Sequence, residues 1–237
     1  MKHLFLSTSL ALGLCLGALP VTAQTPATSV GVLIGPSMIW LRGDYYLQDL
    51  YEPDYGFGAG LFAQRRLTDR FGFRLEALYE RKGALVDFGT AYPVSTPGGS
   101  GATRTEPYRD HRRFNYLTIP LLLRFATGAP EKYFLQAGPY VGVLLCQRDV
   151  VRLQGKTTKD DFTSSYKGLD AGLTVAVGSV VRRWDRVHVT IEARGSWGLV
   201  DIADFDNATS AMVGQQVRTT SVGLLLGVAF DPAAQTK

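Results

Sequence analysis

The sequence predicts an all-β protein: an eight-stranded antiparallel transmembrane up-and-down β-barrel with short periplasmic turns and long extracellular loops. Three observations lead to this fold class. The chain starts with a secretory leader, its later segments alternate apolar and polar residues, and the connections between those segments alternate in length. After residue 23, no apolar run reaches the roughly 20 residues that a membrane helix needs.

The N-terminal segment, residues 1–23, has the features of a secretory signal peptide. The polar start Lys2-His3 precedes an apolar stretch at residues 4–19, and small residues before Gln24 form a cleavage pattern. This order is typical of secreted chains, and the apolar stretch is too short for a membrane anchor. We expect cleavage after Ala23 and an outer-membrane β-barrel domain over residues 24–237, with strands between about 30 and 230.

The clearest alternation lies at residues 169–199, which are predicted to form two strands joined by a four-residue turn. In the second of them, Val189, Ile191 and Ala193 alternate with Thr190, Glu192 and Arg194. Side chains on a strand point alternately to opposite faces. The apolar face would form the core of a soluble sandwich, whereas in an outer-membrane barrel it contacts lipid and the polar face lines the interior.

Connection lengths favour the barrel over the sandwich. The short turns are predicted at residues 68–70, 127–132 and 183–186, and long loops at 41–55, 85–113, 149–166 and 200–216. Bacterial outer-membrane barrels have short periplasmic turns and long extracellular loops, whereas a sandwich has no reason to sort its loops this way. The eight predicted strands are Val30–Trp40, Gly56–Leu67, Phe71–Ala84, Phe114–Phe125, Tyr133–Arg148, Lys167–Arg182, Val187–Leu199 and Val217–Phe230.

Alternation along these strands places charged side chains on the inner face of the predicted barrel. An eight-stranded barrel is just wide enough for side chains to fill its interior, where an isolated charge is costly. We therefore expect the inner charges to pair across strands and to fill the lumen. The candidate lumen charge network consists of Arg74, Glu76, Arg124, Asp170, Glu192 and Arg194.

The predicted extracellular loop at residues 85–113 contains a cluster of basic residues. Arg109, Arg112 and Arg113 form a candidate extracellular surface-binding cluster. One interpretation is a solvated loop face, because charged residues are usually exposed. The other is contact with the phosphates of lipopolysaccharide in the outer leaflet.

Composition and motifs argue against several other functions. The formal net charge of +4 is too small to suggest nucleic-acid binding. Cleavage of the leader would leave Cys146 as the only cysteine, which excludes an intramolecular disulfide and a multi-cysteine zinc site. Two histidines would also remain, His111 and His188, with Ser164, Ser165, Asp160 and Asp161 in another outer loop, but no catalytic motif joins them. We expect no catalytic residues, no cofactor and no metal site.

The segment Tyr116–Phe125, with the sequence YLTIPLLLRF, resembles a strand of the PorT-like outer-membrane β-barrel proteins. Residues 138–142, 170–173 and 198–202 fit the same family, and the resemblance extends over about residues 30–230. It implies a small barrel in the bacterial outer membrane. The founding member of that family is associated with protein secretion and gliding, while most members have no assigned activity.

These observations together predict a non-enzymatic outer-membrane protein of the cell envelope with a structural or accessory role, in a secretion, gliding or adhesion assembly. Its expected partners are outer-membrane lipid, lipopolysaccharide and other envelope proteins. Two alternatives are a narrow solute channel and a barrel enzyme that modifies lipids. A channel would need an open lumen, and an enzyme would need a nucleophile beside one of the two histidines.

Overall fold

The computed structural model describes residues 28–43, 51–94, 102–127, 131–153, 156–204 and 216–232. The predicted signal peptide, residues 1–23, lies outside these ranges. No helix in the described ranges is long and apolar enough to cross a membrane.

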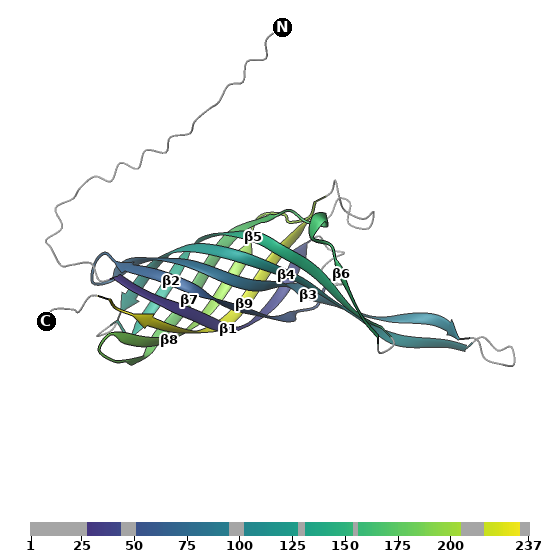
Figure 1. Ribbon diagram of the computed structural model, residues 1–237, viewed down its shortest axis with the longest axis horizontal. Helices are drawn as coiled ribbons and strands as arrows, with labels where there is room; N and C mark the ends of the chain where they lie inside the picture. The colour runs from purple at the N-terminus through teal and green to yellow at the C-terminus, as the bar shows by residue number, and fades with distance from the viewer. Residues whose placement is uncertain are drawn as a thin grey trace, which may run out of the picture.

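Eight antiparallel strands form a closed barrel (Figure 1). Their order around the wall is β4-β3-β2-β1-β9-β8-β7-β5, and pairing of β4 with β5 closes the ring. A further short strand, β6 (Lys156–Asp161), continues the sheet beyond β5. The barrel strands are β1 (Thr28–Gly43), β2 (Asp54–Arg66), β3 (Phe71–Val94), β4 (Ala102–Thr127), β5 (Tyr133–Leu153), β7 (Leu169–Arg183), β8 (Val187–Gly198) and β9 (Val217–Phe230).

The alternation in the sequence sets which side chains face outward. On β4, Leu117, Ile119, Leu121 and Leu123 are 39–50% exposed, while their neighbours are buried inside the barrel. The other seven barrel strands carry outward-facing apolar residues in the same way. Together these side chains form the apolar belt that an outer-membrane barrel presents to lipid. The predicted fold class is therefore confirmed.

The predicted strands are confirmed, but the predicted loop at residues 85–113 is wrong over most of its length. Strand β3 continues to Val94 and β4 begins at Ala102, and these two residues are still paired. The two strands leave the barrel as a long two-stranded ribbon (Figure 1). The inward-pointing backbone groups of the two strands pair with each other, and the outward-pointing groups can be satisfied by water.

The loop predicted at residues 149–166 is also partly ordered. Strand β5 continues to Leu153 and turns back as β6, which is followed by a 3-10 turn, η1 (Thr163–Ser165). Four strands, β3, β4, β5 and β6, therefore form one sheet outside the barrel, which we call the extracellular sheet.

The first and last strands of the barrel begin and end at the short-turn end. Val30 pairs with Phe230, and the Ser29 hydroxyl donates a hydrogen bond to Asp231. The backbone N–H of Asp231 donates to the Arg186 carbonyl in the turn between β7 and β8. This end is periplasmic, because outer-membrane barrels have their short turns there.

Candidate functional site

Four of the six predicted lumen residues form one closed ring of ion pairs. Glu76 lies 2.8 Å from Arg74 Nε and 2.6 Å from Arg194 Nη1. Glu192 lies 2.6 Å from Arg194 Nη2 and 3.4 Å from Arg74 Nη1. All four side chains are at most 4% exposed, and their formal charges sum to zero. We call this group the ionic tetrad.

The ionic tetrad spans the barrel from one wall to the other. Arg74 and Glu76 lie on β3, and Glu192 and Arg194 lie on β8. Three strands separate β3 from β8 in either direction around the ring, so these two strands face each other across the lumen. Because the paired side chains come from opposite walls, they fill the space that a solute would have to cross.

The fifth predicted residue, Asp170, belongs to a separate group nearer the extracellular end. Lys82 Nζ lies 2.9 Å from Asp170 Oδ2, which also accepts hydrogen bonds from Thr219 Oγ1 at 2.8 Å and Tyr140 OH at 3.1 Å. The Lys82 ammonium lies over the Tyr140 ring, 4.2 Å from its centroid. Tyr140 lies on β5, which pairs with β7, whereas Lys82 on β3 and Thr219 on β9 approach Asp170 only because the ring is closed.

The sixth predicted residue, Arg124, lies at the periplasmic end and joins neither group. Its guanidinium stacks over Phe134 at 3.7 Å from the ring centroid. Gln136 lies between Arg124 and Arg74, and its amide oxygen can accept from Arg124 Nη1 at 2.9 Å and Arg74 Nη1 at 3.2 Å. The predicted single network is therefore divided among three levels of the lumen.

An aromatic lid covers the extracellular end of the lumen. Phe114 on β4 packs against Tyr166 in an edge-to-face contact, with ring centroids 4.7 Å apart. The lid segment after β8 is held by backbone hydrogen bonds, in which Ile202 donates to the Val217 carbonyl and Lys167 donates to the Ile202 carbonyl. The buried residues of this lid are Leu41, Tyr51, Ala84, Val86, Phe114, Tyr116, Tyr166, Ile202, Ala203 and Val217.

The predicted basic cluster is split by the two faces of β4. Arg112 turns toward the lid, where it donates hydrogen bonds to Tyr51 OH and to Asp110 Oδ2. Arg109 and Arg113 alternate with it and lie on the other face of the extracellular sheet. Arg109 pairs with Asp87 at 2.8 Å and keeps 58% of its side chain exposed. The predicted cluster of three is therefore wrong in one member, because strand pairing replaces the flexible loop that was expected.

Asp149 lies beside Arg112 above the apolar belt and has an unusually high pKa. Burial raises its pKa to about 6, and the nearby Asp110 carboxylate adds to this effect, while Arg112 opposes it. The ordinary pKa of an aspartate is close to 4. Because the folded lid binds this proton more tightly than the unfolded chain does, the corresponding stabilisation is complete below pH 4 and is lost as the pH rises through 6.

The two histidines lie at opposite ends of the barrel. His111, on the outer face of β4, has Nδ1 2.8 Å from Asp54 Oδ2. In the ranges that the structure describes, His111 has no hydrogen bond to a serine or cysteine, and Ser164 and Ser165 lie at η1. His188 is buried at the periplasmic end, with Nδ1 3.7 Å from Asp231 Oδ2. Neither histidine forms the nucleophile–base pair of a hydrolase with these residues.

A closed eight-stranded barrel with an apolar belt and a polar lumen is the architecture of a small outer-membrane protein. Residues 22–204 match the family model of the outer membrane protein beta-barrel domain. The chain belongs to this family. It is accordingly an outer-membrane β-barrel protein located in the bacterial outer membrane, as predicted. No curated protein sequence matches the chain.

Solved structures of other outer-membrane proteins are similar to this chain at low sequence identity. Ail, the attachment invasion locus protein of Yersinia pestis, is 13% identical with a TM-score of 0.42, covering 86% of this chain and 99% of Ail. Neisserial surface protein A is 13% identical with a TM-score of 0.43, covering 85% and 96%. The outer membrane protease OmpT from Escherichia coli is 9% identical with a TM-score of 0.41, covering 90% and 99%.

Proposed function

We propose that this protein is a non-enzymatic, non-conducting outer-membrane barrel with a structural or accessory role, which presents a rigid sheet on the cell surface. The observation that carries the proposal is the ionic tetrad, because it joins opposite walls of the lumen. The second group around Lys82 and Asp170 and the aromatic lid add two further layers above it. A solute would have to separate buried ion pairs at each of the first two levels, and this is energetically costly.

The alternative of a narrow solute channel is tested by conductance. We expect wild-type protein in planar bilayers to give no steady current. The double variant Glu76→Ala/Arg194→Ala removes half of the ionic tetrad. It should conduct small currents only if the aromatic lid also opens. A large steady conductance of the wild-type protein would contradict a filled lumen and would favour the channel.

The alternative of a lipid-modifying enzyme depends on the pair formed by His111 and Asp54. The distance of 2.8 Å between His111 Nδ1 and Asp54 Oδ2 is similar to the contact that orients the histidine base of a hydrolase. A hydrolase also requires a nucleophile beside that base. We expect His111→Ala and wild-type protein to leave phospholipid, lipid A and peptide substrates equally intact. Hydrolysis by the wild-type protein that disappears in His111→Ala would contradict the non-enzymatic role.

The surface partner that we propose is lipopolysaccharide, which would contact the outer face of the extracellular sheet. Arg113 lies directly opposite Arg148 on β5, and Arg81 lies diagonally from Arg113 on β3. Just below them, Leu117 and Leu145 belong to the apolar belt. Guanidinium groups at this height meet the phosphates of the outer leaflet and can bind them in a bidentate manner.

A double variant tests this contact while leaving the lid intact. Arg109→Gln/Arg113→Gln should keep the fold and reduce binding to lipopolysaccharide vesicles at low salt, with the difference shrinking at high salt. Arg182→Gln, at the exposed periplasmic end, is the matched control. Equal binding to lipopolysaccharide by wild type and both variants at low salt would show that Arg109 and Arg113 do not bind this lipid.

The broader setting that we propose is a secretion, gliding or adhesion assembly with envelope protein partners. The resemblance of Tyr116–Phe125 to PorT-like proteins supports the secretion and gliding settings. The extracellular sheet supports a partner-binding role, because loops and ribbons on a rigid barrel can carry recognition without disturbing the wall. Co-purification of cross-linked envelope proteins with the wild-type chain, and their loss when the β3–β4 ribbon is shortened, would support this setting.

A further inference from the structure

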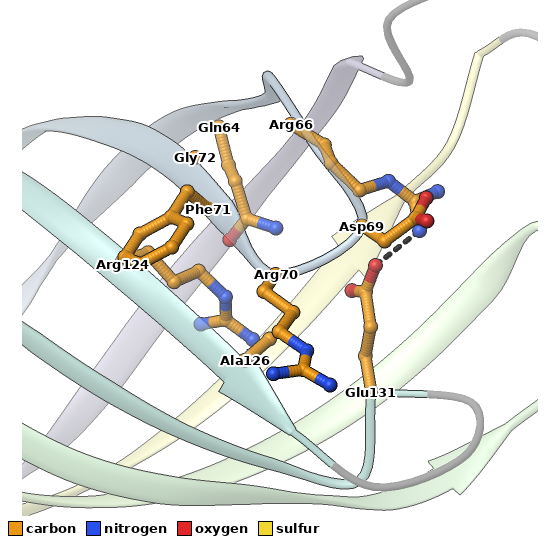
Figure 2. Close-up of a pocket in the computed structure, with 9 residues that line it drawn as sticks. All are labelled: Gln64, Arg66, Asp69, Arg70, Phe71, Gly72, Arg124, Ala126 and Glu131. Atoms are coloured by element: carbon orange, nitrogen blue, oxygen red, sulfur yellow. Dashed lines mark hydrogen bonds and ion pairs between the residues drawn. The ribbon is translucent and has the colours of Figure 1, made fainter. Parts of the chain in front are cut away.

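A small polar pocket opens at the periplasmic end, between the β2–β3 turn and the start of β5 (Figure 2). Arginine side chains reach it from three places: Arg66 at the end of β2, Arg70 in the turn, and Arg124 on β4. The free volume is about 10 Å³, which is about the space of one water-sized oxygen, and the pocket is open toward the periplasm. The pocket therefore has room for one polar atom at its base, next to cationic side chains.

The charges around this pocket do not balance. Asp69 and Glu131 are the two carboxylates that line it, and Glu131 forms an ion pair with Arg66, so the three arginines exceed the carboxylates by one charge (Figure 2). Arg124 is only 4% exposed and makes no ion pair within the part of the chain that the structure describes. Two carboxylates act on Arg124, but Glu131 already pairs with Arg66 and Glu192 belongs to the neutral ionic tetrad.

Two further observations show that Arg124 has unused binding capacity. Its Nε is buried and has no hydrogen-bond partner among the described residues, although its Nη1 can donate to Gln136. Two further cations act on Arg124, and Arg74 does so more strongly than Arg183. A buried guanidinium without a counter-charge and with a free N–H is costly, and an anion supplies both missing interactions at once.

We propose that this pocket binds a phosphate group at the periplasmic mouth, with Arg124 as the buried ligand and Arg70 as the exposed one. One phosphate oxygen occupies the free space beside Arg124, and the other oxygens face Arg70 and the periplasm. Guanidinium groups suit this ligand because their planar N–H pairs match two phosphate oxygens. The headgroup of a lipid in the periplasmic leaflet and free inorganic phosphate share this chemistry.

A lipid in the periplasmic leaflet can bring its phosphate headgroup to this pocket. Phe71 lines the pocket and is 46% exposed on the outer face, where it packs against Phe125 with ring centroids 5.2 Å apart. Aromatic rings at a barrel rim lie at the level of the lipid headgroups. A phosphate in the pocket is therefore within reach of the leaflet, and this site is independent of the extracellular sheet.

The experiment measures binding to detergent-folded full-length protein by titration calorimetry. The probes are inorganic phosphate, dihexanoyl phosphatidylglycerol, and acetate at matched ionic strength. We expect phosphate or phosphatidylglycerol to bind and acetate to bind more weakly. Arg124→Gln should weaken phosphate binding about tenfold or more, the effect of losing a charge-assisted hydrogen bond, and Arg70→Gln should weaken it less.

Arg65→Gln is the matched control, because Arg65 is exposed at the same rim and lies opposite outward-facing Phe73. Binding of the lipid but not of inorganic phosphate identifies a headgroup site, and the reverse identifies a solute site. Arg70 lies on an exposed turn, so Arg70→Gln should fold normally. If Arg124→Gln fails to fold, the comparison of Arg70→Gln with wild type still tests the proposal. Absence of binding by both phosphate probes, or equal binding by wild type, Arg124→Gln and Arg70→Gln, overturns the proposal.

Discussion

Removing the charge of Glu76 should be among the most destabilising conservative changes in the barrel. Glu76 is the acidic residue with short contacts to both arginines of the ionic tetrad, at 2.8 Å and 2.6 Å, and its side chain is fully buried. Glu76→Gln keeps the shape but leaves two guanidinium groups against the single carboxylate of Glu192. Breaking a buried ion pair by removing one partner costs about 3–5 kcal/mol, and we expect a loss in that range.

Urea unfolding in detergent micelles, followed by tryptophan fluorescence, measures this loss. The double variant Glu76→Gln/Arg194→Met removes one charge of each sign, so it should be more stable than the sum of the single variants implies, by about 1–3 kcal/mol. Thr174→Val is the control, because it removes a neutral buried hydrogen bond to Ser196 and should cost about 1 kcal/mol. A smaller loss in Glu76→Gln than in Thr174→Val would show that the barrel does not depend on the charge of Glu76.

Three further predictions concern other levels of the molecule. Lys82→Met leaves Asp170 buried with only hydroxyl partners, so it should destabilise the barrel by about 3–5 kcal/mol in the same urea assay, and Asp170→Asn in the same chain should recover part of the loss. Asp149→Asn should flatten the fall in stability that the wild-type protein shows between pH 4 and 6, and an unchanged pH profile would contradict a role for this carboxyl. Gly83→Ala should raise amide hydrogen exchange at the base of the β3–β4 ribbon, because Gly83 has φ +148° and a Cβ there would lie 1.8 Å from the Arg112 carbonyl oxygen. Exchange equal to that of wild type would show that the ribbon tolerates the change.

The barrel wall could be predicted from sequence because one face of each strand meets lipid and the other does not. On β8, Ile191 and Trp197 contrast with Glu192 and Arg194, and this contrast sets the period of two. The β3–β4 ribbon lacks the contrast. Arg109, His111 and Arg113 lie on one face, and Asp110 and Arg112 lie on the other. Because both faces are polar, the sequence shows no alternation there, and the strand is identified only by its pairing with β3.

The lumen could be predicted only in part for a different physical reason. Alternation shows that Arg74 and Glu192 point inward, but it carries no information on which strands face each other across the ring. That relation depends on strand number and closure. The assignment of Asp170 to Lys82, and of Arg124 to a separate periplasmic pocket, therefore required the closed barrel.

The ionic tetrad also bears on the order of folding. Glu76 and Arg194 are 118 residues apart in the chain, and their strands face each other only in the closed ring. The tetrad is therefore expected to form late, after the rate-limiting step. Contacts that are absent from the transition state slow unfolding while leaving the folding rate nearly unchanged. We therefore expect the ring of charges to slow unfolding, so that an assembled barrel stays in the membrane for longer than its equilibrium stability alone would suggest.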